Sequence, residues 1–467
     1  MKTYTTSENA LTDFFFTCGA LRNEPMKRVE QIFENALKED PLIATRILFY
    51  SRDIRGGQGE RRLFRICLNY LCNNSSNKVV MDFIKNNLHL IPHYGRWDDV
   101  LVLLGHDNKL DKLIGGFIKL SLHYGDSLCA KWMPREKSSK KDLAKKIRKL
   151  LGLSAKDYRK LLSKNTQVVE NQMCAKEWAE INFSSVPSQA FLRYRNAFRR
   201  HQEERFEQFN KDVSEGKETV NAGTLHPHQI ISKCLSHEVN RLEMNNLWNN
   251  LKEFYTTSEK ILPIIDVSGS MQQGTPMALH VSIALGLYIA ERNTGAFNNF
   301  FITFDSNPEF VLANQECIVE RVIETSNADW GGSTNLEKTF EVILEKATLN
   351  NLKQEDMPTK IIILSDMEFD SACASYGSET YNYSALEMIN KKYVDAGYMM
   401  PKIIFWNLAS RNENKPVRFD EEGTALISGF SPSIMASVLG DKEFTPYSIM
   451  MDALEKYKEK ISFKLHY

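Results

Sequence analysis

The sequence predicts two regions of different fold class: an all-helical N-terminal region, then a doubly wound α/β region with a mainly parallel sheet. In residues 1–250, apolar side chains recur at helical spacing between short polar or glycine-containing joints. After Ile261, short apolar runs alternate with amphipathic stretches, as in parallel sheets covered on both faces. The chain has 467 residues, which is enough for several domains with hydrophobic cores of their own. We therefore expect domains at residues 1–250 and 251–467.

The N-terminal region carries a series of short amphipathic segments. We expect helices at Ala44 to Tyr50, Leu63 to Leu71, Val79 to Leu88 and Val100 to Leu104. Phe191 to Phe209 is a further amphipathic stretch. Short helices in succession are typical of a HEAT-like solenoid, although the sequence has no clean repeat period.

The C-terminal region alternates between the two kinds of element. The expected strands are 261–266, 299–304, 360–366, 402–408 and 424–429. The expected helices are 277–292, 316–325, 335–347, 384–396, 432–439 and 446–460. This alternation is what predicts parallel strands joined by helical crossovers.

The formal net charge of zero hides an uneven distribution. Residues 1–250 hold 40 Lys and Arg against 29 Asp and Glu, whereas residues 251–467 hold 19 against 30. The first region is therefore basic by 11 charges and the second acidic by 11. This division indicates either a polyanion-binding first region or two regions that attract each other.

Cysteine usage and hydropathy bear on location. The eight cysteines are scattered without a Cys-x-x-Cys pair, which argues against a structural zinc site and a disulfide framework. The N-terminus lacks the apolar core of a signal peptide, and no apolar run approaches the ~20 residues of a membrane span. We therefore expect a cytoplasmic protein that does not bind membranes.

Polar residues follow the first expected strand of the sheet. The apolar run from Ile261 ends in Asp266-Val267-Ser268-Gly269-Ser270. In an open α/β sheet, ligands bind beyond the carboxyl ends of the strands. One carboxylate and two hydroxyls, without sulfur or imidazole, suit a hard cation such as Mg²⁺. The alternative is that the Asp and Ser side chains cap the following helix.

Two later segments complete this pattern. Trp330 to Asn335 offers the Thr334 hydroxyl from a glycine-containing loop, and the run Ile361 to Leu364 leads into Ser365-Asp366. The order Asp-x-Ser-x-Ser, Thr and strand-end Asp resembles the metal-ion-dependent adhesion site (MIDAS) of von Willebrand factor A (vWA) domains.

This resemblance implies a ligand set. Ser268, Ser270 and Thr334 would bind the metal directly, and Asp266 and Asp366 would act mainly through bound water. The ion would be Mg²⁺ or another divalent cation such as Mn²⁺. Its sixth position would accept an acidic group from a protein partner.

The most distinctive N-terminal segment runs from Ser51 to Arg62 and contains three glycines and several arginines. Glycines let backbone N–H groups approach a phosphate, and arginines pair with one. The alternative is a turn between helices whose arginines bridge neighbouring helices through Asp53, Glu60 or Asp98.

A second basic stretch, Lys131 to Lys164, holds 13 Lys and Arg against 3 Asp and Glu. Tyr194 and Phe198 lie among further arginines and either stack on unpaired bases or belong to a buried helix face, which the spacing favours for Phe198. The candidate RNA contacts are Arg52, Arg55, Arg61, Arg62, Lys137, Lys140, Lys141, Lys145, Lys146, Arg193 and Arg195.

Several motifs spread over both regions support a wider resemblance. They include His93 to Asp99, Trp132 to Glu136, Ile181 to Ser188, Ser365 to Asp370 and Phe405 to Leu408. With these motifs the chain resembles an uncharacterised family that joins a helical N-terminal region to a vWA domain. More distantly, its architecture is similar to the Ro ribonucleoprotein (TROVE) proteins. That resemblance implies a ring of helical repeats that binds small structured RNA.

The predicted function is a non-catalytic RNA-binding scaffold, part of a ribonucleoprotein, with a magnesium-dependent partner site. The alternative is a metal-dependent protein-interaction or particle-structural module without nucleic acid. An enzyme ranks last, because no Ser/His/Asp order, Cys/His pair or phosphate-binding lysine loop is present. The sequence does not indicate an oligomeric state.

Overall fold

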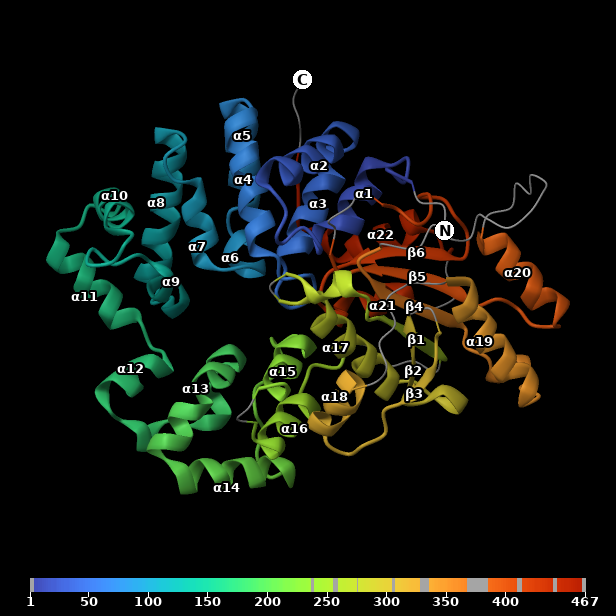
Figure 1. Ribbon diagram of the computed structural model, residues 1–467. Coiled ribbons are helices and arrows are strands. Elements are labelled where there is room, and N and C mark those ends of the chain that lie inside the picture. Colours follow the sequence, from blue (N-terminus) through green and yellow to red (C-terminus); the bar gives the residue numbers. More distant parts are fainter. Residues whose placement is uncertain are drawn as a thin grey trace. The chain divides into compact units, whose positions relative to one another are not determined.

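A computed structural model describes most of the chain (Figure 1). The described residues are 4–236, 239–254, 259–274, 276–304, 307–327, 336–367, 385–409, 414–439 and 443–463.

The chain forms two compact units whose segments interleave. The sheet unit comprises Met1–Arg28, Gly56–Gln58 and Ala222–Lys456, and the helical unit comprises Val29–Arg55, Gly59–Asn221 and Tyr457–Tyr467. Contacts therefore group the chain differently from the sequence-based division at residue 250. The start of the chain joins the sheet unit because its first helix packs on the last strand.

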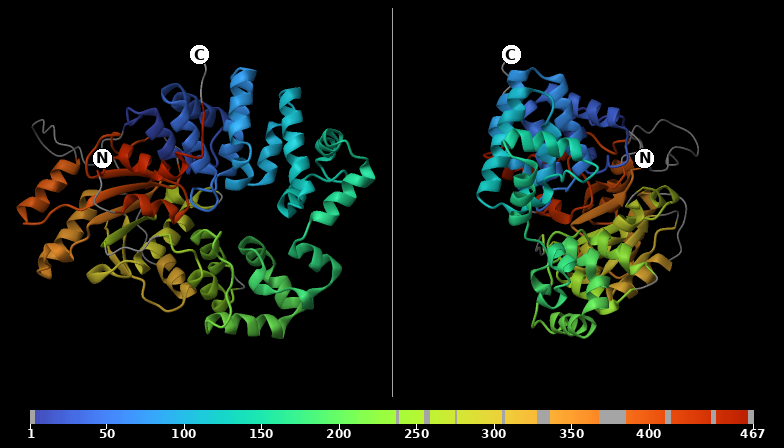
Figure 2. Two further views of the ribbon diagram at one scale, coloured as in Figure 1. Left: turned by 180° about the vertical axis from the view of Figure 1, so that it is seen from behind. Right: turned by 90° about the vertical axis from the view of Figure 1, so that its left-hand side faces the viewer.

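The helical unit consists of helices that follow one another in sequence order, as the colour gradient in Figure 2 shows. Some helices pack on their sequence neighbours, such as α3 on α4 and α13 on α14, whereas α10 packs on α8 and α11 on α9. The helices are α2 (Met26–Glu39), α3 (Pro41–Arg52), α4 (Arg61–Asn74), α5 (Asn77–Asn87), α6 (Leu90–Tyr94), α7 (Trp97–Val100), α8 (Asn108–His123), α9 (Ser127–Trp132), α10 (Lys141–Leu151), α11 (Ala155–Asn165), α12 (Val169–Ala175), α13 (Ser188–His201) and α14 (Glu203–Ser214).

Local sequence sets where these helices begin and end. The Asp107 side chain accepts hydrogen bonds from the Lys109 and Leu110 amides and caps α8. Gly152, with a left-handed backbone, ends α10, and the Ser154 side chain then caps α11. The basic stretch therefore folds as two capped helices joined by a short turn.

The sheet unit contains, among the described residues, one six-stranded sheet of order β3-β2-β1-β4-β5-β6. Its strands are β1 (Ile261–Asp266), β2 (Phe300–Phe304), β3 (Phe310–Leu312), β4 (Lys360–Ser365), β5 (Lys402–Asn407) and β6 (Thr424–Ser428). Its helices are α1 (Ala10–Cys18), α15 (Pro227–Cys234), α16 (Arg241–Asn249), α17 (Ala278–Glu291), α18 (Ile318–Asn327), α19 (Leu336–Leu349), α20 (Ala385–Asp395), α21 (Met435–Val438) and α22 (Pro446–Leu454).

Neighbouring strands are parallel except for the edge pair β2–β3. The expected α and α/β regions and the mainly parallel sheet are therefore present. Strand β3 was not predicted, because three residues are too few to show an alternating pattern.

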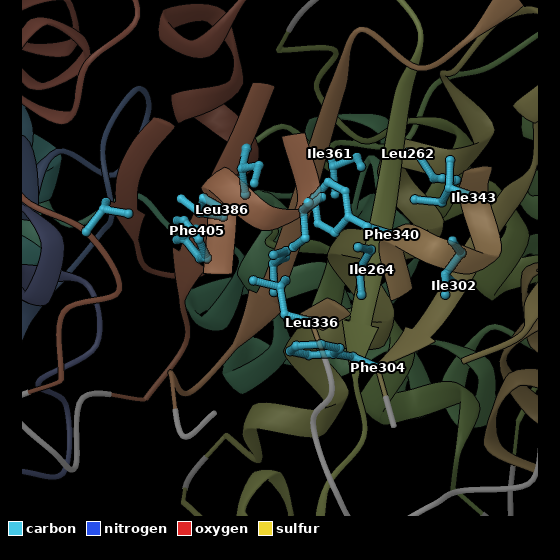
Figure 3. Packing of buried hydrophobic residues seen from close by; sticks show 14 of the residues in the cluster. Leu262, Ile264, Ile302, Phe304, Leu336, Phe340, Ile343, Ile361, Leu386 and Phe405 are labelled. Atoms are coloured by element: carbon cyan, nitrogen blue, oxygen red, sulfur yellow. The ribbon is translucent and has the colours of Figure 1, made fainter. Parts of the chain in front are cut away.

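Helices cover both faces of the sheet. On one face, side chains of α19, including Phe340 and Ile343, pack with Ile264 and Ile302 of the strands (Figure 3). On the other face α17 approaches β1 closely, since a Cβ added at Gly286 would lie 2.3 Å from the Ile265 side chain. Alternate residues of each buried strand thus serve opposite layers.

In the C-terminal region, the expected helix 432–439 is a 3-10 turn, Pro432–Ile434, followed by α21, and the expected helix 446–460 ends as α22 at Leu454.

Two amphipathic stretches of the N-terminal region also differ from a single helix. Val100 to Leu104 forms only a short 3-10 turn, Leu101–Leu103, because Gly105 follows with a φ of 107° and turns the chain away. The stretch from Phe191 to Phe209 is two helices, broken at Gln202, whose φ and ψ of −147° and 52° are not helical.

Adjacent glycines of α8 provide a direct test of packing in the helical unit. A Cβ at Gly115 would lie 2.9 Å from Leu150 Cβ of α10, whereas one at Gly116 would meet no atom within 4 Å. We expect Gly115→Ala to lower the free energy of unfolding by about 1–3 kcal/mol through overpacking. Gly116→Ala, the matched control, should gain about 0.5–1 kcal/mol of helix stability. Hydrogen exchange of α10 should accelerate in the first variant alone; equal exchange in both would contradict this packing.

Candidate functional site

Polar residues end four adjacent strands of the sheet. β1 ends in Asp266, β4 in Ser365, β5 in Asn407 and β6 in Ser428. The register pairs Ser365 with Asn407 and Asn407 with Ser428. Because these strands are parallel, their carboxyl ends lie along one edge, where open α/β sheets bind ligands.

Asp266 is the buried carboxylate among these groups. Its side chain is fully buried, and its Oδ1 accepts a hydrogen bond of 2.9 Å from the Ser268 amide. Its Oδ2 accepts a hydrogen bond from the Ser365 hydroxyl. Burial raises the pKa of the Asp266 carboxyl to about 7, the bond from Ser365 opposes that shift, and the negative charge of Asp366 adds to it.

The two serines of the motif lie together in the loop that follows β1. Their Oγ atoms are 3.0 Å apart, and Ser268 is buried while Ser270 is half-buried. Ser268 begins a short 3-10 turn, Gly269–Gln272, without a side-chain capping bond. Helix α17 begins at Ala278 after Met277, again without a side-chain cap. The capping interpretation of this motif is therefore wrong.

Asp366 lies just beyond the end of β4 and is 3% exposed. The next residue, Met367, has a φ of 65°, an uncommon conformation for a bulky side chain. Its amide donates a 3.0 Å hydrogen bond to Ser365 Oγ. Unusual backbone conformations of this kind cluster at functional sites.

The donor set in the described residues fits a hard divalent cation. Two buried carboxylates and two neighbouring hydroxyls supply oxygen ligands only, and an ion would offset the cost of burying Asp266. Thr334 lies outside the described residues. Within the described part of the chain, no group of three His, Cys, Asp or Glu side chains could hold a metal, so a site here needs the hydroxyls.

Ser365 is a site residue that sequence reasoning did not assign. Its hydroxyl donates to Asp266 and accepts from the Met367 amide, so it joins the ends of β1 and β4. The available signal was a hydroxyl residue between a buried apolar run and a strand-end acid.

The glycine-rich segment does not form an open phosphate cradle. Gly57 and Gln58 are buried. The Gly56 carbonyl accepts from the Lys456 ammonium, and the Gly57 carbonyl accepts a 3.1 Å bond from the Ser433 hydroxyl. These glycines let the loop pack closely within the sheet unit.

Arg52 is a correction to the predicted RNA contacts. Its side chain is 2% exposed and forms a 2.8 Å ion pair with Asp99, which also receives Arg65 at 2.6 Å. Arg65 and Arg96 both pair with Asp98. Arg52 therefore bridges α3 and α7 in a buried network, as the alternative expected, but through Asp99 and not through Asp53, Glu60 or Asp98.

The other predicted contacts near this segment differ in exposure. Arg55 is exposed, and its guanidinium donates to the His93 carbonyl at 2.7 Å. Arg61 and Arg62 are exposed on α4. Burial and the charges of Arg96 and Arg65 lower the pKa of Arg61, and the charges of Asp98 and Asp99 oppose that shift.

The predicted contacts at α10 and α13 are mostly at the surface. Lys146 is half-buried and pairs with Asp111 at 2.7 Å, and Arg195 is half-buried and donates to the Leu192 carbonyl. Phe198 is fully buried among other phenylalanines, which confirms the buried-face interpretation. The exposed contacts are Lys137, Lys140, Lys141, Lys145 and Arg193.

Comparisons with known proteins place the chain in a family. Residues 1–104 and 117–260 match the model of a domain of unknown function, DUF2828. The chain belongs to the DUF2828 family. Residues 260–464 match a second domain of unknown function, DUF7788, so this DUF2828 protein joins the two.

This DUF2828 protein is also similar to the uncharacterized protein L728 of Acanthamoeba polyphaga mimivirus. The two are 30% identical over 510 residues, which cover 98% of this chain and 86% of that protein. Among solved structures, the RO (RSR) protein of Deinococcus radiodurans aligns over 96% of this chain and 99% of that chain. Its TM-score of 0.33 and 11% identity are too low to bear on function. No helix in the described residues is long and apolar enough to cross a membrane.

The raised pKa of Asp266 predicts a pH effect in metal-free protein. Between the ordinary value of 3.8 and about 7, the folded state keeps a proton that the unfolded state has lost, so the free energy of unfolding falls as pH rises. Asp266→Asn should remove this fall, which amounts to about 2.7 kcal/mol between pH 5 and pH 7. Thermal unfolding in the presence of a chelator at pH 5 and pH 8 measures this change in the free energy of unfolding. An equal loss of stability in the wild type and in Asp266→Asn would contradict the assignment of Asp266 as a buried acid that is protonated at pH 5.

Proposed function

We propose that this DUF2828 protein is an RNA-binding scaffold, in which exposed cations of the helical unit bind phosphates without base specificity. The observation that carries the proposal is the basic surface of α10, α11 and the segment before them, which we call the α10–α11 surface. Its exposed cations are Lys137, Lys140, Lys141, Lys145, Lys149, Lys156, Arg159, Lys160 and Lys164.

The spacing of these cations suits a polyanion. On α10 they recur at every fourth residue, while Ala144, Ile147 and Leu151 bury the opposite face. Successive cations on such a face lie about one helical turn, ~5.4 Å, apart. On the same surface the exposed acids are Asp142 and Asp157, so positive charge dominates. Phosphates neutralised there would release counterions, which drives binding at low salt.

We further propose that the carboxyl edge of the sheet unit is a MIDAS-like site of a vWA-type domain. Asp266, Ser268, Ser270 and Asp366 would hold Mg²⁺ or Mn²⁺, with Thr334 as a further ligand. The ion supplies one open position, which binds an acidic side chain of a protein partner. The burial of both carboxylates and the 3.0 Å hydroxyl pair support this role.

The metal proposal predicts a ligand-dependent gain in stability. Mg²⁺ at about a hundred times its Kd should stabilise the wild type by about 2.7 kcal/mol. Asp266→Asn should lose most of this gain, because the buried ligand charge is removed. Asp420→Asn, at an exposed acid that precedes β6 and so lies toward the amino end of that strand, is the control and should keep it. Differential scanning fluorimetry measures all three; an unchanged response in Asp266→Asn would reject the site.

The RNA proposal predicts a strong salt dependence. Replacing Lys141, Lys145 and Lys160 by Gln should reduce the slope of log K against log salt by about 2–3, since each phosphate contact contributes about 0.7–0.9. A filter-binding titration with a labelled RNA hairpin that carries a single-stranded tail measures the slope.

The control for this titration carries Gln at the exposed lysines Lys27, Lys353 and Lys391. All three belong to the sheet unit, Lys27 because the first turn of α2 lies in that unit. Its slope should match the wild type. Absent binding, or a wild-type slope near zero, would contradict the RNA proposal. If polyglutamate of matched charge displaced the RNA equally well, the protein-interaction alternative would replace it.

A further inference from the structure

A groove in the helical unit lies apart from the cations assigned to RNA. It is open to solvent, has a volume of about 450 Å³ and is lined by residues of α8 and of the end of α5. Leu88, Leu113, Phe117 and Leu120 supply its apolar side chains, and Lys85 and Lys112 add cations on either side.

The apolar residues of α8 follow helical spacing on a face that extends beyond the groove. Leu113, Phe117, Leu120 and Tyr124 lie at positions i, i+4, i+7 and i+11, which form one stripe of a helix. Leu120 is 55% exposed and Tyr124 79% exposed. Such a stripe normally packs against another apolar element.

The floor of the groove is shaped before any ligand binds. Phe117 stacks on Trp97 with ring centroids 4.8 Å apart, which holds its ring in place. Gly116 faces open space within the groove, since an added Cβ there would meet no atom within 4 Å. A second helix could therefore approach α8 closely at this turn.

The charge around the groove has one sign. Lys85, Lys112 and Lys119 are exposed, His89 is an exposed lining residue, and the lining contains no acid. Asp111 of α8 is buried and pairs with Lys146 of α10, so it does not offset these cations. An occupant with acidic residues beside an apolar stripe would match both features.

We propose that this groove binds an acidic amphipathic helix of a partner protein, by the helix-in-groove mode. An RNA base fits it less well, because the Phe117 ring already stacks on Trp97 and the other apolar side chains of the lining are leucines. The inference is independent of the RNA proposal, since the α10–α11 cations do not line the groove.

A peptide titration tests the proposal on the full chain. The probe is a fluorescein-labelled 18-residue helix with Leu at positions i, i+4, i+7 and i+11 and Glu beside them. Fluorescence anisotropy should show saturable binding to the wild type. Leu120→Asp, at an exposed position that tolerates a charge, should weaken it at least tenfold. Lys211→Glu, at an exposed lysine of α14, is the control and should bind as the wild type does.

A charge swap makes the assignment specific. The double variant Lys85→Glu, Lys112→Glu should bind the Glu peptide more weakly than the wild type does. It should bind a matched peptide that carries Lys in place of Glu more tightly. Absent binding to the wild type, or unchanged binding by Leu120→Asp, would overturn the proposal. So would loss of RNA-hairpin binding, instead of peptide binding, in Leu120→Asp, because the groove would then belong to the RNA surface.

Discussion

The Asp266 carboxylate accepts hydrogen bonds from the Ser268 amide and the Ser365 hydroxyl, and these bonds join the loop after β1 to the end of β4. The surrounding architecture makes this contact possible. β1 and β4 are adjacent parallel strands, so both end at the same edge. A fully buried carboxylate next to Asp366 is costly unless a proton or a cation compensates its charge. The proposed cation site follows from this electrostatic constraint.

The helical unit divides its cations between two roles. Arg52 and Arg65 converge on Asp99 in a buried network that fixes neighbouring helices. The lysines of α10 and α11 other than Lys146 instead remain at the surface, because Ala144 and Ile147 use the opposite face of α10 for packing. Buried ion pairs favour a defined arrangement, whereas exposed lysines retain their hydration until a polyanion displaces it. Of these two groups, the exposed lysines are the ones that the proposed RNA-binding function uses.

Much of the fold was predictable because strand and helix periods differ. The apolar run ending at Asp266 and the run ending at Ser365 are strands at nearly the expected positions, since continuous burial leaves a clear pattern. Their strand-end acids could be proposed for the same reason. The ion-pair partner of Arg52 could not be predicted, because the sequence does not reveal which carboxylate pairs with a buried arginine. The groove on α8 was likewise hidden, since the exposure of Leu120 depends on what packs beside it.

The most direct test of the central claim is an anomalous difference map from a crystal grown with Mn²⁺. We predict one strong peak at the carboxyl edge of the sheet, within coordinating distance of the Ser268 and Ser270 hydroxyls and next to Asp266 and Asp366. A well-ordered edge without a peak, or a peak held only by residues elsewhere, would contradict the claim that these buried oxygens form a cation site.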